Sequence, residues 1–158
     1  MKIWKTISKI KNYKTADLLK NLKNKNFKTS AWIDDIFDKK NMEIRNIKLP
    51  INLYRISLKD LGLNEPTELK KIYETSKSQG FKLIDPKLVL ICRELYLEQP
   101  TGEWLRFATP LDSMIDSDGV PHLPKLGKAL NYYFIETYWS YPNAIFHPHD
   151  EFVFCKWF

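Results

Sequence analysis

The apolar residues near the start of the chain follow the spacing of a helix. Between Ile3 and Ile10 they recur every three or four positions with lysines between them, which predicts a short basic amphipathic helix. Thr15 can cap a second helix with a leucine stripe, and Ser30 can cap a third. The first part of the chain is therefore predicted to be helical.

Further along, the pattern changes between the period of a strand and that of a helix. Alternation over residues 47–53 predicts a half-buried strand, at a sheet edge or broken at Pro50, because proline cannot donate a ladder hydrogen bond. A helix follows Pro66, and Gly80 suits its C-terminal end. Residues 88–97 are so apolar that their periodicity leaves helix and strand both open.

The rest of the chain is rich in aromatic and β-branched residues. A strand is expected around Leu105 and Phe107, a loop over 112–128, and two more strands over 130–139 and 152–158. Helices come first and strands later, which predicts an α+β fold with an antiparallel or mixed sheet rather than a doubly wound one.

The charge of the chain is uneven. The whole sequence of 158 residues carries a net charge of +6, but residues 1–28 alone hold nine lysines and a single acid, Asp17. We therefore predict a basic helical arm over 1–26 and one compact domain over 27–158. The lysines of the arm fit nucleic-acid binding, contact with an anionic membrane or a partner helix, or a solvated helix face. The candidate binding residues of the arm are Lys2, Lys5, Lys9 and Lys11.

Several classes of protein are disfavoured by what the sequence lacks. Cys92 and Cys155 are the only cysteines, too few for a disulfide framework, and they lack zinc-site spacing. The sequence contains no apolar run long enough for a membrane span and no signal-peptide pattern. It also contains no glycine-rich phosphate loop and no nucleophile elbow. We therefore expect a cytoplasmic protein without a cofactor.

Two segments carry residues of the kind that bind metals. Asp116 and Asp118 precede Gly119 in an acidic loop, but the register of a calcium-binding loop fails there, which favours an ordinary turn. His147 and His149 flank a proline in an His-Pro-His-Asp turn, where a surface turn is again the simpler interpretation. A metal site or hydrolase active site would require the loop and the turn to meet.

Trp104 and Arg106 are two residues apart on a predicted strand and should share a face of the sheet. A tryptophan beside an arginine can form a recognition surface by stacking and cation–π contact. The alternative is that another element covers them, since large aromatic side chains are more often core residues.

The segment from Glu94 to Leu111, ELYLEQPTGEWLRFATPL, is followed by Asp-Ser-Asp-Gly at 116–119 and ends in an aromatic strand. This arrangement resembles a group of small bacterial proteins that share a QPxGEWLxxAMxPIxDSDG core. The likeness extends from Phe27 onward, although Thr109 stands where that group often has methionine. It implies one compact domain with a basic extension in a bacterial cytoplasm, and it implies no catalytic residue.

These observations favour a non-enzymatic binding or accessory protein whose partner is another protein or a nucleic acid. The lysine arm would supply affinity, and Trp104 with Arg106 would supply specificity. The alternative is a small hydrolase or metal-dependent enzyme that uses Asp116, Asp118, His147 and His149.

Overall fold

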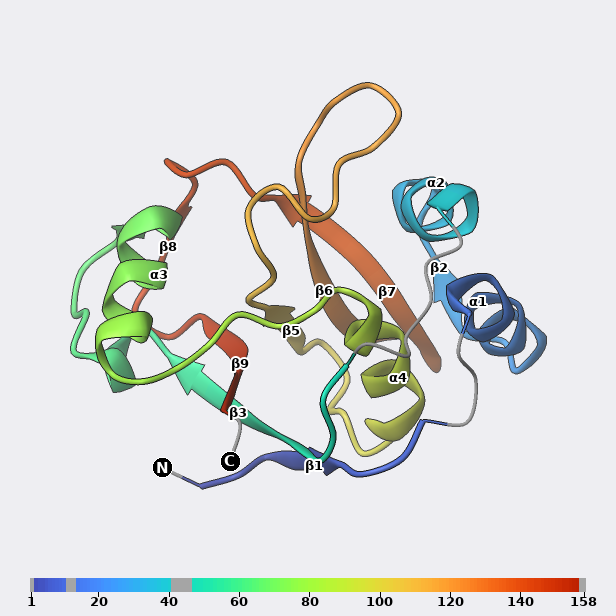
Figure 1. The fold of residues 1–158 in the computed structure, drawn as a ribbon, viewed down its shortest axis with the longest axis horizontal. Helices are drawn as coiled ribbons and strands as arrows, with labels where there is room; N and C mark the ends of the chain where they lie inside the picture. The colour runs from blue at the N-terminus through green and yellow to red at the C-terminus, as the bar shows by residue number, and fades with distance from the viewer. Residues whose placement is uncertain (1, 11–13, 41–46, 157–158) are drawn as a thin grey trace.

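A computed structural model describes residues 2–10, 14–40 and 47–156, and it has the α+β fold that the sequence predicts. Within these ranges, four α-helices lie between residues 15 and 95, and most of the strands lie between 104 and 156 (Figure 1). None of the helices in these ranges is long and apolar enough to cross a membrane.

The apolar stripes predict the helices well. The α-helices are α1 (Thr15–Asn24), α2 (Ala31–Lys40), α3 (Leu69–Ser78) and α4 (Lys87–Leu95), and a short 3-10 helix, η1, spans Lys59–Leu61. Ser30 caps α2 by accepting the backbone N–H of Ile33 at 3.3 Å. Gly80 follows Gln79, the C-cap residue of α3, and has a left-handed conformation with φ 88°. Glycine favours this conformation at the C-terminal end of a helix, as predicted. The segment left open between helix and strand forms α4.

The main sheet is mixed and has the strand order β1-β3-β9-β5-β6-β7-β2. Its strands are β1 (Lys5–Ile7), β2 (Lys28–Thr29), β3 (Ile51–Ser57), β5 (Trp104–Phe107), β6 (His122–Ala129), β7 (Tyr132–Trp139) and β9 (Glu151–Lys156). The β5–β9 and β2–β7 pairs are parallel, and the other pairs are antiparallel. A second, two-stranded sheet joins β4 (Thr67–Glu68) to β8 (Ile145–Phe146).

Three predicted elements differ from the structure. The helix predicted over 3–10 is wrong, because Lys5 to Ile7 pair with β3 as strand β1. The loop predicted over 112–128 is wrong from His122 onward, where β6 begins. The strand predicted over 47–53 starts only after Pro50, which agrees with the predicted break at that proline, and it continues to Ser57. It lies between β1 and β9, so the alternative of an edge position is wrong.

Helices cover the two faces of the sheet unequally. One face packs on α1, α2 and α4, in a core that takes alternate residues of the strands, such as Leu105, Leu126 and Ile135. The leucines of α1 belong to this core, as does Ile7 of β1. The other face packs on α3, η1 and β8, and the core on that side ends at Leu123, near the start of β6. Figure 1 shows α3 and β8 on one side of the sheet and α1, α2 and α4 on the other.

Candidate functional site

The candidate site is on the face of the main sheet that packs on α3, in the part of that face that none of the described helices covers. Its residues come from β5, β6 and β7, and their register places their side chains on one side of the sheet. We call this surface the open face; its residues are Trp104, Arg106, Lys125, Phe134, Glu136 and Tyr138. A hollow of about 350 Å³ lies here, lined by residues that include Trp104, Lys125, Phe134 and Glu136.

A tight turn sets the register of the open face. Leu130 and Asn131, which join β6 to β7, both have positive φ, 54° and 79°, as a two-residue hairpin turn requires. The hairpin then pairs Gly127 with Phe134 and Lys125 with Glu136. The turn therefore determines which cation, acid and ring become neighbours.

Trp104 is the central ring of the open face. It pairs with Gly127 of β6, and its indole occupies the space that a side chain at 127 would take. The ring is 6.4 Å from that of Phe134, and the residue is 36% exposed. Lys125 places its Nζ 4.6 Å from the centroid of the indole and 5.9 Å from that of Tyr138. A cation therefore lies between two partly exposed aromatic rings.

Lys125 and Glu136 face each other across β6 and β7 without an ion pair among the described contacts. Burial, and then the charge of Arg106, lower the pKa of Lys125. Burial raises the pKa of Glu136 against the attraction of Lys125. Burial thus disfavours the charged forms of two ionisable groups that line one hollow, an arrangement typical of a binding or catalytic site.

The edge of the open face continues the mixture of rings and cations. Tyr132 is 46% exposed, and Lys28 of β2 places its Nζ 4.9 Å from the centroid of its ring. Lys28 is level with Phe134 in the parallel β2–β7 pair, so the two side chains point to the same side of the sheet.

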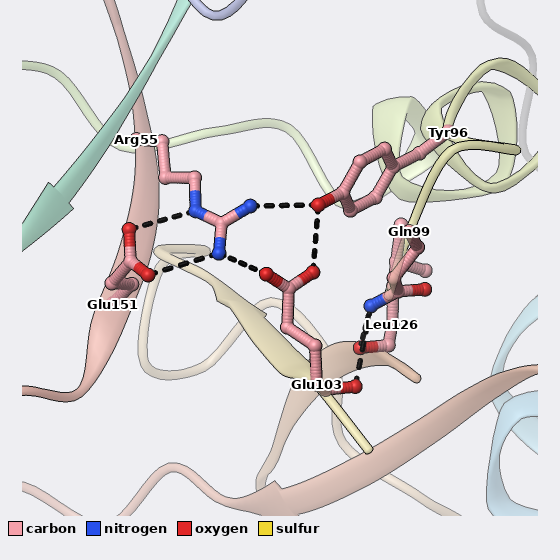
Figure 2. A network of polar contacts seen from close by, with 6 residues as sticks. All are labelled: Arg55, Tyr96, Gln99, Glu103, Leu126 and Glu151. Carbon is pink, nitrogen blue, oxygen red and sulfur yellow. Dashed lines mark hydrogen bonds and ion pairs between the residues drawn. The ribbon is translucent and has the colours of Figure 1, made fainter. Parts of the chain in front are cut away.

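A network of polar side chains on the opposite face supports the start of β5 (Figure 2). Arg55 of β3 binds Glu151 through Nε at 2.7 Å and also binds Glu103. Tyr96 accepts a hydrogen bond from Arg55 and donates one to Glu103, each at 2.7 Å. Burial alone would lower the pKa of Arg55. The carboxylates of Glu151 and Glu103 have the larger effect together, and the pKa of this guanidinium is raised. Burial and the bond to Glu103 raise the pKa of Tyr96 to about 12. Glu103 directly precedes Trp104, so the network holds the first residue of the open face.

Arg93 supports the hairpin from the same opposite side. It is fully buried on α4 and donates hydrogen bonds to the carbonyls of Gly127 at 3.0 Å, Phe134 at 3.1 Å and Tyr96 at 2.7 Å. Burial lowers the pKa of Arg93 to about 10. Gly127 and Phe134 are a cross-strand pair beneath Trp104, so Arg93 is a positioning residue for the open face.

Lys5, the predicted arm lysine that belongs to β1, lies away from the open face. Lys5 pairs with Glu98 at 2.9 Å and lies near the rings of Trp4 and Tyr96, on the side of the sheet that the helices cover. Lys2 and Lys9 are exposed, and Lys11 lies outside the described residues. The structure thus brings Trp104 and Arg106 together but separates them from Lys5.

The predicted metal residues do not gather at one place. Asp116 binds His122 at 2.8 Å, and His122 contacts the hydroxyl of Thr137 at 3.0 Å. The other oxygen of Asp116 accepts two backbone N–H groups of its own loop. His147 and His149 are exposed in a turn that Figure 1 shows well apart from this loop. Among the described residues, no group of three or more His, Cys, Asp or Glu side chains could hold a metal ion.

Two larger hollows lie elsewhere on the molecule. One of about 680 Å³ lies between α1 and α4, where Lys25 is already bound to Glu94. The other, about 510 Å³, lies beside α3 and is lined by Tyr73 and Leu83, among others. Neither combines several exposed rings with adjacent cations, which is the chemistry that distinguishes the open face.

Sequence reasoning missed Lys125, Phe134 and Glu136 as site residues. The alternation of Tyr132, Phe134, Glu136 and Tyr138 on one side of a predicted strand was the signal available in the sequence. Comparisons of the chain with protein-family models, with curated proteins and with solved structures give no match.

Proposed function

We propose that this is a non-enzymatic binding protein that holds single-stranded nucleic acid on the open face. The observation that carries the proposal is the position of Lys125 between the rings of Trp104 and Tyr138. Unpaired bases stack on aromatic side chains of a sheet, while cations beside the rings bind the backbone phosphates.

The charges around the open face support an anionic ligand over a neutral or basic one. Arg106, Lys125 and Lys28 contribute positive charge on this side, beside the two acids Glu136 and Asp150. The whole chain is basic, with a net charge of +6. Charge of this sign attracts any nucleic acid, and the exposed rings favour a strand whose bases are unpaired.

Lys5 lies on the opposite side of the sheet from the open face, so we expect the arm to contribute less to binding than Trp104 does. Lys2 and Lys9 would add long-range attraction rather than contacts beside the rings. A cytoplasmic location belongs to the same proposal, since both cysteines are free and buried.

Binding can be measured by the fluorescence anisotropy of labelled single strands of about 12 nucleotides, between about 50 and 200 mM salt. We expect salt-sensitive binding that Trp104→Ala weakens about tenfold or more, because stacking on one ring contributes about 1–3 kcal/mol. Trp32→Ala is the matched control, since Trp32 is exposed on α2, which packs on the opposite face of the sheet.

Two outcomes would overturn the proposal: absence of binding at the lower salt concentration, or equal loss in the two tryptophan variants. The arm is tested separately with Lys2→Ala and Lys9→Ala together. Deleting residues 1–26 would not serve, because Ile7, Leu18 and Leu22 are part of the core. The double lysine variant should lower affinity less than Trp104→Ala at the higher salt concentration, where long-range attraction is screened.

A further inference from the structure

Arg106 and Lys125 stand directly opposite each other on β5 and β6. Like charges in such a cross-strand pair destabilise a sheet unless something compensates them. The charge of Arg106 contributes, after burial, to the lowered pKa of Lys125. The pair is thus an unfavourable arrangement in the protein alone, and an anion bound between the two side chains would relieve it.

The hydrogen-bonding capacity of Arg106 is largely unused. Its one described ion pair is to Asp150, at the long distance of 3.4 Å, and its buried Nε has no hydrogen-bond partner. The other oxygen of Asp150 accepts the backbone N–H of His147 at 2.8 Å. The guanidinium carbon is 5.4 Å from the ring centroid of Phe146, so an aromatic surface lies on one side of the group. A planar guanidinium with free donors suits a phosphate oxygen.

Two acids limit the charge of the anion. Asp150 contacts Arg106, and Glu136 lies beyond Lys125 on β7, so two positive side chains stand between two carboxylates. A phosphodiester carries one negative charge, whereas a terminal phosphate carries up to two near neutral pH. The carboxylates repel the second charge, and the arrangement therefore fits an internal linkage better than a chain end.

We infer that Arg106 and Lys125 together bind one phosphodiester of a single strand whose bases stack on Trp104. This inference rests on the proposed function and names the group of the ligand that the cation pair recognises. Trp104 would hold a base, and the cross-strand pair of Arg106 and Lys125 would hold the linkage next to that base.

The test uses single-strand affinity and its dependence on salt in Arg106→Gln and Lys125→Gln. Each substitution should weaken binding about tenfold or more, since a hydrogen bond to a charged group contributes about 1.5–3 kcal/mol. Each should also reduce the slope of log affinity against log salt concentration by about 1. Lys128→Gln is the matched control, because Lys128 lies on β6 but points to the opposite side, 5.0 Å from the ring centroid of Tyr133.

Far-UV circular dichroism and urea unfolding of each variant separate a lost contact from a lost fold. Glu136→Gln should raise single-strand affinity, whereas the two cation variants lower it, because this substitution removes a carboxylate that repels the phosphate. Affinity and salt slope unchanged in both cation variants, with Trp104→Ala still weakened, would overturn the phosphodiester site and leave the proposed function standing. No binding by the unaltered protein would overturn both.

A second experiment distinguishes an internal linkage from a chain end. NMR titration compares a dinucleoside monophosphate, which has one phosphodiester, with a nucleoside monophosphate, which has a terminal phosphate. We expect the first to bind more tightly and to lose that advantage in Arg106→Gln. Tighter binding of the terminal phosphate would overturn the preference for an internal linkage.

Discussion

The indole of Trp104 lies directly over Gly127, so that a Cβ atom at position 127 would stand 2.3 Å from Cζ3 of the ring. Such a contact is far inside van der Waals distance, and one of the two groups would have to move. The absence of a side chain at 127 is therefore a condition for the position of Trp104. The bonds of Arg93 to the carbonyls of Gly127 and Phe134 hold the strands beneath it.

Gly127→Ala should displace Trp104 while leaving the fold intact. The backbone at 127 is not among those with positive φ, so alanine is allowed there, and the lower entropy of the unfolded chain offsets part of the lost packing. We expect a change in stability within about 1 kcal/mol, with a red shift of tryptophan fluorescence and weaker single-strand binding. A double-mutant cycle provides the control, because Gly127→Ala should have no further effect on binding once Trp104 is alanine.

Arg93→Met should destabilise the protein by about 2–4 kcal/mol, because it removes three hydrogen bonds to buried carbonyls. Arg93→Lys keeps a positive charge but replaces the planar guanidinium with one compact ammonium group. We expect this variant also to lower the free energy of unfolding. Urea unfolding measures both. Stability of the lysine variant within about 0.5 kcal/mol of the unaltered protein would show that charge alone, and not the geometry of the fork, supports the hairpin.

Local patterns predict the elements whose hydrophobic stripe is also their packing surface. The leucines of α1 and the stripe of α3 are correctly predicted for this reason. The segment around Lys5 fails because its spacing suits a helix, whereas the backbone of β3 offers it a strand partner. The strand β6 is not predicted because Pro124, Gly127 and its lysines weaken the strand pattern. Gly127 breaks the pattern because the ring of Trp104 occupies the space of its side chain.

The site shows the same division between local and tertiary information. The spacing of Trp104 and Arg106 places them on one face, as the structure finds. Lys125 and Phe134 join them through the order of strands in the sheet, which no short pattern contains. The pairing of Asp116 with His122 is a local contact by comparison, since a β-bridge between Ile115 and Pro121 closes the short loop between them.

The pairing of Asp116 with His122 predicts a dependence of stability on pH. The hydrogen bond from His122, followed by those from backbone N–H groups, lowers the pKa of Asp116 from its ordinary value of 3.8. Between the lowered pKa and 3.8 the unfolded chain binds more protons than the folded one, so stability falls as the pH drops through this range. Asp116→Asn should therefore flatten the loss of stability below about pH 4, measured by urea unfolding at several pH values. Asp118→Asn is the matched control on the exposed part of the same loop, and an equal flattening there would contradict the assignment to Asp116.

Leu130 offers a substitution that should stabilise the protein. It occupies the first position of the β6–β7 turn with φ 54°, and 82% of it is exposed, so its side chain contributes little packing. A branched apolar residue is disfavoured in this backbone region, whereas asparagine is among the residues that adopt it most readily. Leu130→Asn should therefore raise the free energy of unfolding by about 0.5–1 kcal/mol, measured by urea denaturation. Leu130→Ala removes the same exposed side chain but retains the unfavourable conformation, so it should give a smaller gain. Equal stability of the two variants would mean that lost apolar exposure, and not the geometry of the turn, is responsible. Leu130→Asn preserves the conformation of this turn, and the turn sets the register that pairs Lys125 with Glu136. Single-strand affinity in this variant should therefore remain unchanged.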